Sequence, residues 1–361
     1  MALTLKIESP PKMTQKIIAG ILGASGYTGV ELIRLLDQHP HVELRTLGAH
    51  SNAGQPVQTV FPHLPDDMPM LQKMADMPLD QLDVLFAGLP HGTTGDVLPE
   101  LLRQYPKLRI IDLSADFRLD DPAVYHEAYD AQHPTPEALS KGIYGLSEIY
   151  ADSIADAELV ACPGCYCTAA NLSLIPLLRS QTIQARDIII DAKSGTSGAG
   201  RAAKTNLLFT EVNHGLNAYS IGKHRHMWEI EQELSKAAGS ALKVSFTPHL
   251  VPINRGILAS SYVHLSEGKT VNDLYTALQE FYANAPFVRV LELGQSPKTQ
   301  NVFGSNNVEI AVFADRLDGR AIVLCAIDNL LKGASGQAVQ NMNLMFDFPE
   351  TTGLNRIALY P

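Results

Sequence analysis

The sequence lacks the features that mark several broad classes of protein. Only 18% of its 361 residues are charged, one is tryptophan, and no stretch approaches the roughly 18 consecutive apolar residues that a membrane-spanning helix requires. The 28 lysines and arginines are outnumbered by 38 acidic residues, and they form no run longer than two. Because nucleic-acid-binding domains usually carry a basic patch, the sequence predicts neither a membrane span nor a nucleic-acid partner.

Cysteine is also scarce. Three of the four cysteines lie together at Cys162, Cys165 and Cys167, which does not resemble the disulfide framework of a small secreted protein. Residues 1–16 also lack the apolar core of a secretory signal. We therefore expect a cytoplasmic protein, with a flexible leader over residues 1–15.

The chain is long enough for two domains, and its first half alternates apolar runs with helical patterns. Such alternation favours βαβ units, so we expect an α/β fold with a doubly wound, Rossmann-type parallel sheet over residues 16–162. Residues 120–160, rich in Pro, Tyr and Ala, are expected to form irregular connections. The predicted strands of this domain are 17–22, 42–50, 82–90, 108–116 and 158–162.

The pattern changes after residue 162. A helix is predicted from Cys165, followed by short and partly alternating apolar runs that are typical of a mixed or antiparallel sheet. We expect a second, α+β domain over residues 163–328, with residues 329–361 supplying a helix that returns to the first domain. The predicted strands here are 186–194, 241–251, 256–265, 308–315 and 321–328.

A glycine-rich turn separates the first predicted strand from the first helix. Gly23, Gly26 and Gly29 have the spacing G-x-x-G-x-x-G, which lets backbone amides approach a pyrophosphate at the positive end of a helix. This context favours a dinucleotide site over a plain tight turn. The end of the second strand, residues 47–52, carries no acid to hold a ribose hydroxyl, and Ser51 can donate to a 2′-phosphate. NADP is therefore preferred to NAD, unless Ser51 and Asn52 are only turn residues.

The cysteine cluster admits three interpretations. Cys162 and Cys165 could be half of a zinc site, but a second ligand pair is missing and only one segment supplies ligands, so no metal is predicted. They could also form a redox disulfide. The favoured interpretation makes Cys165 a nucleophile at a helix N-terminus, where the thiol pKa should be lowered, with Cys162 and Cys167 as packing residues.

An acid/base partner for a nucleophilic cysteine must come from elsewhere in the chain. His226 is the first choice and His224 the second, since both precede a predicted helix with Glu229 one turn on. Two histidines at this spacing could also be ordinary surface residues.

Nine motifs occur in the order found in one family. They are GASGYTG, FAGLPHG, DLSADFRL, YGLSE, PGCY, AKSGTSGAGR, GKHRHMWEIEQ, PHLVPINRGIL and DNLLKGASGQAVQ. From about residue 16 to the last helix, the chain resembles the N-acetyl-gamma-glutamyl-phosphate reductases, relatives of aspartate-semialdehyde dehydrogenase in the arginine pathway. The resemblance implies a second domain of the glyceraldehyde-3-phosphate dehydrogenase-like type, which carries catalysis and assembly into a homodimer or homotetramer.

The resemblance also implies an activity, the NADPH-dependent reductive dephosphorylation of an acyl phosphate with release of inorganic phosphate. Cys165 would form a thioester, and His226, or else His224, would move the proton on the hemiacetal oxygen. The residues implied to bind NADP are Gly23, Ser25, Gly26, Tyr27, Thr28, Gly29, Ser51, Leu89, Pro90, His91, Ser197, Gly198 and Asn329. Those implied to bind substrate are Ser114, Arg118, Arg255 and Glu229, although each arginine could instead form a structural ion pair.

The chain departs from the family pattern beside the nucleophile. The resemblance leads us to expect Asn in place of Cys162 and Pro in place of Cys167. The extra thiols predict that peroxide inactivates the protein through a Cys162–Cys165 bond that dithiothreitol reverses. Two other functions fit the same residues: the same chemistry on a carrier-protein-linked aminoadipyl or glutamyl phosphate, or a non-catalytic NADP sensor.

Overall fold

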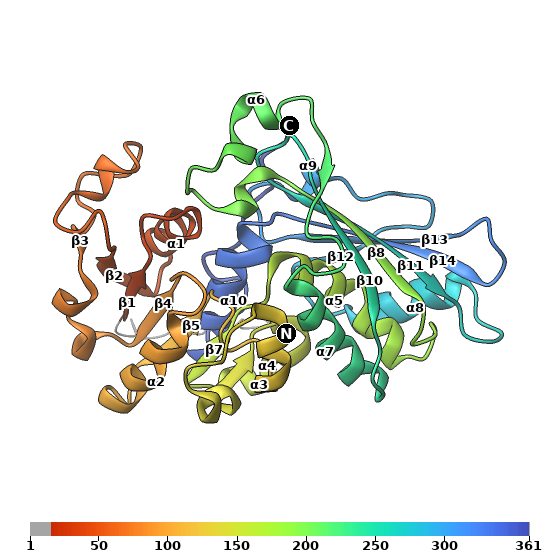
Figure 1. The fold of residues 1–361 in the computed structure, drawn as a ribbon, viewed down its shortest axis with the longest axis horizontal. Helices are drawn as coiled ribbons and strands as arrows, with labels where there is room; N and C mark the ends of the chain where they lie inside the picture. The colour runs from red at the N-terminus through yellow and green to blue at the C-terminus, as the bar shows by residue number, and fades with distance from the viewer. Residues whose placement is uncertain (1–15, 361) are drawn as a thin grey trace, which may run out of the picture.

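Two seven-stranded sheets, each with helices packed on it, make up the computed structural model, which describes residues 16–360 (Figure 1). The predicted flexible leader, residues 1–15, lies outside the described residues. Within residues 16–360, no helix is both long and apolar enough to cross a membrane.

The first sheet has the strand order β3-β2-β1-β4-β5-β7-β6, and all of its strand pairs are parallel. Apolar residues of α1 cover one face, while those of α2 cover the other, as the prediction of a doubly wound sheet requires. The strands are β1 (Ile17–Leu22), β2 (Val42–Gly48), β3 (Leu71–Gln72), β4 (Val84–Ala87), β5 (Arg109–Asp112), β6 (Gly142–Tyr144) and β7 (Leu159–Ala161). The helices are α1 (Tyr27–Asp37), α2 (Thr94–Gln104), α3 (Pro122–Tyr129) and α4 (Ser147–Ala155).

The prediction that residues 120–160 are irregular is wrong, because this stretch contains α3, β6 and α4. Pro122 stands at the start of α3, where a proline has no helical hydrogen bond to lose. Asp121 caps the helix by accepting a hydrogen bond from the N–H of Ala123 at 2.7 Å, and Asp130 ends it in a left-handed conformation. One of the prolines that suggested irregular connections therefore marks the beginning of a helix.

The second sheet is mixed, as predicted, in the order β12-β13-β14-β11-β8-β10-β9. Helices α5, α7 and α8 pack against it, and alternate residues of β11 face this apolar core. The strands are β8 (Ile188–Ser194), β9 (Asn217–Ala218), β10 (Val244–Leu250), β11 (Ile257–His264), β12 (Val288–Val290), β13 (Val308–Ala314) and β14 (Arg320–Ile327). The helices are α5 (Cys165–Arg179), α6 (Phe209–Val212), α7 (His226–Ala238), α8 (Val271–Phe281) and α9 (Thr299–Val302).

The last helix lies between the two sheets (Figure 1). It starts as a π-helical turn, Leu331–Ser335, and continues as α10 (Gly336–Met345). Ala338, Met342 and Met345 are buried in the same apolar cluster as α1 and the first sheet. Helix α10 contacts α1, α4 and β5 of the first half of the chain. The predicted domain limits at residues 162 and 328 remain predictions.

Candidate active site

The predicted site residues gather at one edge of the first sheet. The glycine-rich turn follows β1, Leu89 to His91 follow β4, Ser114 follows β5, and Cys165 follows β7. Because these strands are parallel, the segments after them meet at the carboxyl edge, where open α/β sheets bind their ligands.

The glycine-rich turn has a backbone shape that excludes side chains. Gly23 has φ +81°, and a Cβ there would lie 2.1 Å from the carbonyl oxygen of Gly88. A Cβ on Gly29 would lie 2.5 Å from the carbonyl oxygen of Gly23. Helix α1 begins after Gly26 with no side-chain cap and no acid in its first turn, so its N-terminal amides suit an anionic pyrophosphate.

Residues of the second half reach the same region. Asn329 donates from Nδ2 to Ser197 Oγ at 3.0 Å and accepts at Oδ1 from the N–H of Gly256 at 2.7 Å. A Cβ on Gly198 would lie 3.6 Å from the same Nδ2. A cavity of about 410 Å³ joins Tyr27 of the glycine-rich turn to Ser197. Its full lining is Tyr27, Thr196, Ser197, Gly200, Arg201, Ala202, Ala203, Lys204, Leu207, Leu208, Asn254, Arg255 and Leu330.

The other predicted cofactor residues, Ser51 and His91 among them, do not line this cavity. Ser51 is exposed just after β2, and no acid occurs from residue 47 to 52. His91 accepts at Nδ1 from the N–H of Ala115 at 3.0 Å. Burial, together with Arg118 and Arg225, lowers the pKa of His91 to about 4, so its ring is neutral at pH 7. Ser335 donates to the carbonyl oxygen of Thr28 at 2.9 Å, which ties the π-helical turn to α1.

Cys165 is the first residue of α5, as predicted, and follows the N-cap Gly164. It is half-buried, and a Cβ on Gly333 would lie 2.8 Å from the Cys165 Cβ. The π-helical turn before α10 therefore packs directly on the cysteine, and only glycine fits at position 333. Single π-helical turns of this kind are frequent at functional sites.

The expectation that the helix N-terminus lowers the thiol pKa is wrong for the free site. Burial raises the pKa of Cys165 to about 11, although the guanidinium of Arg118 and the backbone N–H of Tyr166 act in the opposite direction. The removal of the sulfur from water outweighs the favourable dipole, so Cys165 rests as a thiol.

His226 lies against the residue before Cys165. A Cβ on Gly164 would lie 2.4 Å from His226 Nε2, so glycine is required there for the ring to fit. His224 lies farther back, edge-on to the rings of Tyr166, Tyr219 and Phe246, and its Nδ1 accepts from the N–H of His226 at 3.2 Å. Burial, and after it the neighbouring His224, holds the pKa of His226 well below its usual value, so this ring is also neutral.

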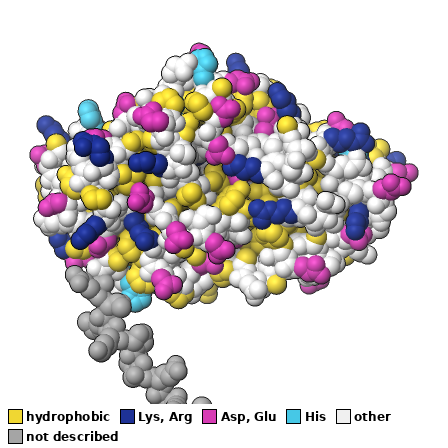
Figure 2. Space-filling view, turned by 90° about the horizontal axis from the view of Figure 1, so that it is seen from below, with side chains coloured by type: hydrophobic (Ala, Val, Ile, Leu, Met, Phe, Trp, Pro, Cys, Tyr) yellow, Lys and Arg dark blue, Asp and Glu magenta, His cyan; other side chains and the backbone are white. Residues whose placement is uncertain are grey.

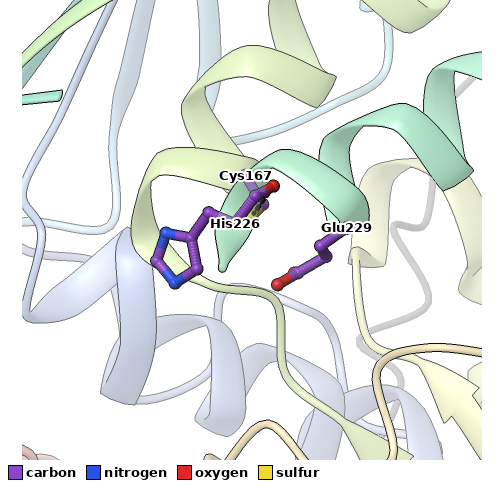
Figure 3. Close-up of side chains that lie close together, drawn as sticks. All are labelled: Cys167, His226 and Glu229. Atoms are coloured by element: carbon purple, nitrogen blue, oxygen red, sulfur yellow. Dashed lines mark hydrogen bonds between the residues drawn. The ribbon is translucent and has the colours of Figure 1, made fainter. Parts of the chain in front are cut away.

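Glu229 has a different environment from the one predicted. The sequence placed it among the substrate-binding residues, but its side chain is only 1% exposed and is held by the protein. Its Oε1 accepts from the N–H of Gly164 at 2.8 Å and from the hydroxyl of Tyr144 at 2.7 Å. Glu229 therefore fixes the loop that precedes Cys165. Figure 3 shows it on the first turn of α7 with His226.

Arg118 is a buried cation close to these groups. Its Nη2 donates to the carbonyl oxygen of Leu113 at 2.9 Å, and its Nη1 lies 3.6 Å from Glu229 Oε2. Its Nε has no hydrogen-bond partner among the described residues. A buried guanidinium with a free N–H group is suited to an anionic ligand. Its contact with Glu229 is the ion pair of the alternative interpretation, and its role in substrate binding remains a prediction.

Two other predicted substrate residues are engaged within the protein. Ser114 is 1% exposed, and its hydroxyl donates to Asp112 at 2.9 Å and contacts Thr94. Arg255 pairs with Glu31 of α1 and lies 3.7 Å from Asp328, although it also lines the cavity. The ion-pair alternative for Arg255 is the one present in this structure.

The two additional cysteines are packed in apolar clusters. Cys162 is 1% and Cys167 is 0% exposed. Asn341 Nδ2 lies 3.6 Å from Cys162 Sγ, and burial raises the pKa of Cys162 to about 12. All four cysteines of the chain are free, and the reversible oxidation of Cys162 with Cys165 remains a prediction.

Sequence reasoning missed Tyr144, Gly164 and Gly333 as residues that shape the site. Each lies inside a quoted motif, respectively YGLSE, PGCY and DNLLKGASGQAVQ. The motifs showed that these residues recur in the family. Each residue shapes the site through a contact with a segment distant in the sequence. Such contacts leave no spacing signal in a single sequence.

The fold and the site together define the class. Residues 18–157 match the model of the semialdehyde dehydrogenase NAD-binding domain, and residues 165–329 match that of the semialdehyde dehydrogenase dimerisation domain. The class is thus that of dinucleotide-binding oxidoreductases with a cysteine at the start of the second domain.

Similar proteins specify the family. A protein of Afipia carboxidovorans named N-acetyl-gamma-glutamyl-phosphate reductase is 51% identical over 350 residues, covering 96% of this chain and 99% of that relative. One of Rhodospirillum rubrum with the same name is 52% identical, covering 97% of this chain and 100% of that protein. The chain belongs to the N-acetyl-gamma-glutamyl-phosphate reductase family of oxidoreductases, which confirms the resemblance seen in the motifs.

Solved structures show the same fold at lower identity. Aspartate semialdehyde dehydrogenase II of Vibrio cholerae has a TM-score of 0.71 at 16% identity, covering 92% of this chain and 99% of that one. Aspartate semialdehyde dehydrogenase of Candida albicans, solved with NADP, has a TM-score of 0.65 at 19% identity, with the same coverage. The two-domain α/β architecture predicted from the sequence is thereby confirmed.

Proposed function

We propose that this chain reduces N-acetyl-L-glutamyl 5-phosphate to N-acetyl-L-glutamate 5-semialdehyde with NADPH, releasing inorganic phosphate, as a step of arginine biosynthesis. The name shared by its close relatives supports the substrate. The observation that supports the mechanism is the fit of the His226 ring against Gly164, the residue before Cys165. A neutral imidazole against the residue that precedes a cysteine at a helix N-terminus supports a role in proton transfer.

The resting protonation states suit a coupled attack. Cys165 is a thiol and His226 is neutral, so the imidazole can accept the thiol proton as Cys165 Sγ bonds to the acyl carbon. The carbon–oxygen bond to phosphate then breaks, leaving a thioester on Cys165 and inorganic phosphate. His226 retains the proton until an oxygen anion forms at the same carbon.

When bound at the glycine-rich turn, NADPH supplies the hydride that reduces the thioester carbonyl. His226 donates its proton to the resulting hemiacetal oxygen, and accepts it again as the carbon–sulfur bond breaks and the aldehyde leaves. The proton then returns to the Cys165 sulfur, which restores the thiol.

Two further residues support this chemistry. Glu229 is a positioning residue, because its Oε1 holds the N–H of Gly164 and so fixes the loop before the nucleophile. Arg118, with its free Nε, is proposed to bind an anionic group of the substrate. The bound cofactor is proposed to be NADP rather than NAD, because the end of β2 has Ser51 and no carboxylate to repel a 2′-phosphate.

The reverse reaction tests the proposal. We expect NADPH to form from N-acetylglutamate semialdehyde, phosphate and NADP, and to form far more slowly with NAD or without phosphate. Cys165→Ser should abolish this turnover while NADP binding persists. A folded, NADP-binding wild type that turns over nothing would instead favour a carrier-linked acyl phosphate, and no NADP binding would refute the cofactor site.

We also propose that the chain forms homo-oligomers through the second sheet. Helices pack on only one face of this sheet, and the opposite face presents Ile189, Leu258, Tyr262, Ile322 and Leu324, all half-buried or exposed. An apolar sheet face of this kind is suited to a second copy of itself. Ile189→Asp is expected to shift the mass measured by light scattering toward the monomer, and an unchanged mass would contradict this interface.

The proposed location is a reducing compartment such as the cytoplasm. All four cysteines are free, and three lie in or beside the active site. Because Cys165 must remain a thiol for the proposed chemistry, a reducing compartment would keep the protein active.

A further inference from the structure

Cys167, His226 and Glu229 form a cluster of possible metal ligands. The Cys167 sulfur, a ring nitrogen of His226 and a carboxylate oxygen of Glu229 all lie within 4.8 Å of one another. Cys167 lies on α5, and the other two residues share the first turn of α7 (Figure 3). In the sequence, one segment alone offered metal ligands, so no metal was predicted, but the packing of α5 against α7 brings in a second segment.

The histidine and the glutamate each have a buried polar atom without a hydrogen-bond partner among the described residues. These atoms are His226 Nδ1 and Glu229 Oε2, and Oε2 also lies 3.6 Å from Arg118 Nη1. The other carboxylate oxygen, Oε1, is held by Gly164 and Tyr144, so the carboxylate has a fixed orientation. The Cys167 thiol makes a weak contact of 3.6 Å with the carbonyl oxygen of His226, and Glu229 lies close enough to accept its proton. Buried polar atoms without partners are uncommon in native proteins and call for an explanation.

We propose that Cys167, His226 and Glu229 bind Zn²⁺, or a similar thiophilic divalent ion, as an inhibitory site. Thiolate, imidazole and carboxylate are the ligand types that zinc prefers, and three protein ligands leave a fourth tetrahedral position for water. Zinc bonds of about 2.0–2.3 Å require ligand atoms closer together than in this structure, which small side-chain rotations can supply. The Cys167 thiol releases its proton to solvent when the sulfur coordinates.

The surrounding charges make the site reversible rather than permanent. Arg118 Nη1 lies 3.6 Å from Glu229 Oε2, so an incoming cation competes with this guanidinium. Arg225 adds positive charge near His226. Inhibition follows because the ion occupies His226, and this consequence alone rests on the proposed function. Metal binding itself does not depend on it.

Metal binding is tested in a variant that lacks the nucleophile, because Cys165 could bind zinc by itself. Co²⁺ is added to the full-length Cys165→Ala protein, since thiolate coordination to Co²⁺ gives a charge-transfer absorption band. We expect one ion per chain, displaced by Zn²⁺. The Cys165→Ala/Cys167→Ala protein should lose the band and bind Zn²⁺ at least about tenfold more weakly.

The control is Cys165→Ala/Cys325→Ala. Cys325 is as deeply buried as Cys167 but lies in β14, away from the cluster, so its removal should preserve the band. In the active background, Zn²⁺ should inhibit turnover, a chelator should reverse the inhibition, and Cys167→Ala should become at least about tenfold less sensitive. Thermal unfolding checks that each variant is folded.

Two outcomes overturn the proposal. No Co²⁺ band in folded Cys165→Ala means that the cluster holds no metal. A band that survives the removal of Cys167 means that the ion is bound elsewhere. An inactive wild type that still binds Co²⁺ through Cys167 would refute the proposed function and leave the metal site standing.

Discussion

Helices α1 and α5 begin in the same way but differ in how deeply they are buried. Each starts after a glycine N-cap, Gly26 or Gly164, with no side-chain cap and no acidic residue in the first turn. The first turn of α1 is half-buried at Tyr27 and Thr28, whereas nearly all of α5 is buried. The same uncapped helix start therefore leaves free backbone amides at the half-buried end of α1 and a cysteine thiol at the start of α5.

The difference shows that burial can outweigh a helix dipole. At α5 the dipole favours a thiolate, yet the pKa of Cys165 is raised to about 11 because its sulfur is enclosed. The neutral His226 lies against Gly164, the residue before Cys165. In the proposed function, the α1 end binds the cofactor by charge, and the α5 end depends on His226 to move a proton.

Matched alanine substitutions at the two N-caps give the largest expected difference. A Cβ at position 164 would lie 2.4 Å from His226 Nε2, so Gly164→Ala must displace the ring. We expect kcat to fall by about 100-fold or more, since an error of about 1 Å in a catalytic group can have this cost. At Gly26 the nearest atom is the Gly23 carbonyl oxygen at 3.4 Å, so Gly26→Ala should raise KM for NADP more than it lowers kcat. If Gly164→Ala and Gly26→Ala lower kcat equally, the two helix ends do not differ in function as proposed.

Replacing the two histidines tests which of them moves the proton. His226→Asn should lower kcat by about 100-fold or more, the usual contribution of an acid/base group. His224→Asn should have a smaller effect, because His224 reaches the site through the N–H of His226. Steady-state kinetics with circular dichroism as a folding control measures both. A larger loss for His224→Asn would reverse the assignment.

Ser51→Asp tests the cofactor preference at the α1 end. A carboxylate at this exposed position after β2 should repel a 2′-phosphate and raise KM for NADP by about tenfold, with little change in kcat. Ser51→Ala is the control, since it removes the hydroxyl without adding charge. If Ser51→Asp leaves KM for NADP as it was, the 2′-phosphate lies elsewhere.

The pH profile should show the smallest change. The pKa of His226 lies well below 6.5, so the imidazole stays neutral as the pH falls from 8 to 6.5. The pKa of Cys165 is about 11, so the thiol stays protonated as the pH rises over the same range. We expect kcat/KM for the aldehyde, at saturating phosphate, to stay within about twofold. If kcat/KM instead rises with an inflection between pH 7 and 8, the thiol pKa is lowered, as the sequence suggested.

Sequence patterns predicted the long strands and missed the short ones. Every predicted strand is present, but β3, β6, β9 and β12 were missed, because strands of two or three residues carry too little periodicity to detect. Helices α3 and α4 were missed because their region, rich in Pro, Tyr and Ala, suggested irregular connections, although Pro122 begins α3 and α4 contains no proline. Cys165 was placed correctly at a helix start, since Pro-Gly before a run of small residues is a local signal.

By itself, the sequence determined the glycine-rich turn, the doubly wound first sheet, the mixed second sheet and the cysteine at the start of α5. These follow from local propensity and from residues close together in the chain. Only the tertiary structure decided that His226 fits against Gly164, that Glu229 holds the loop before Cys165, and that Arg255 pairs with Glu31. Such contacts join segments more than 60 residues apart, and the burial that sets their protonation exists only once both sheets and α10 have packed together.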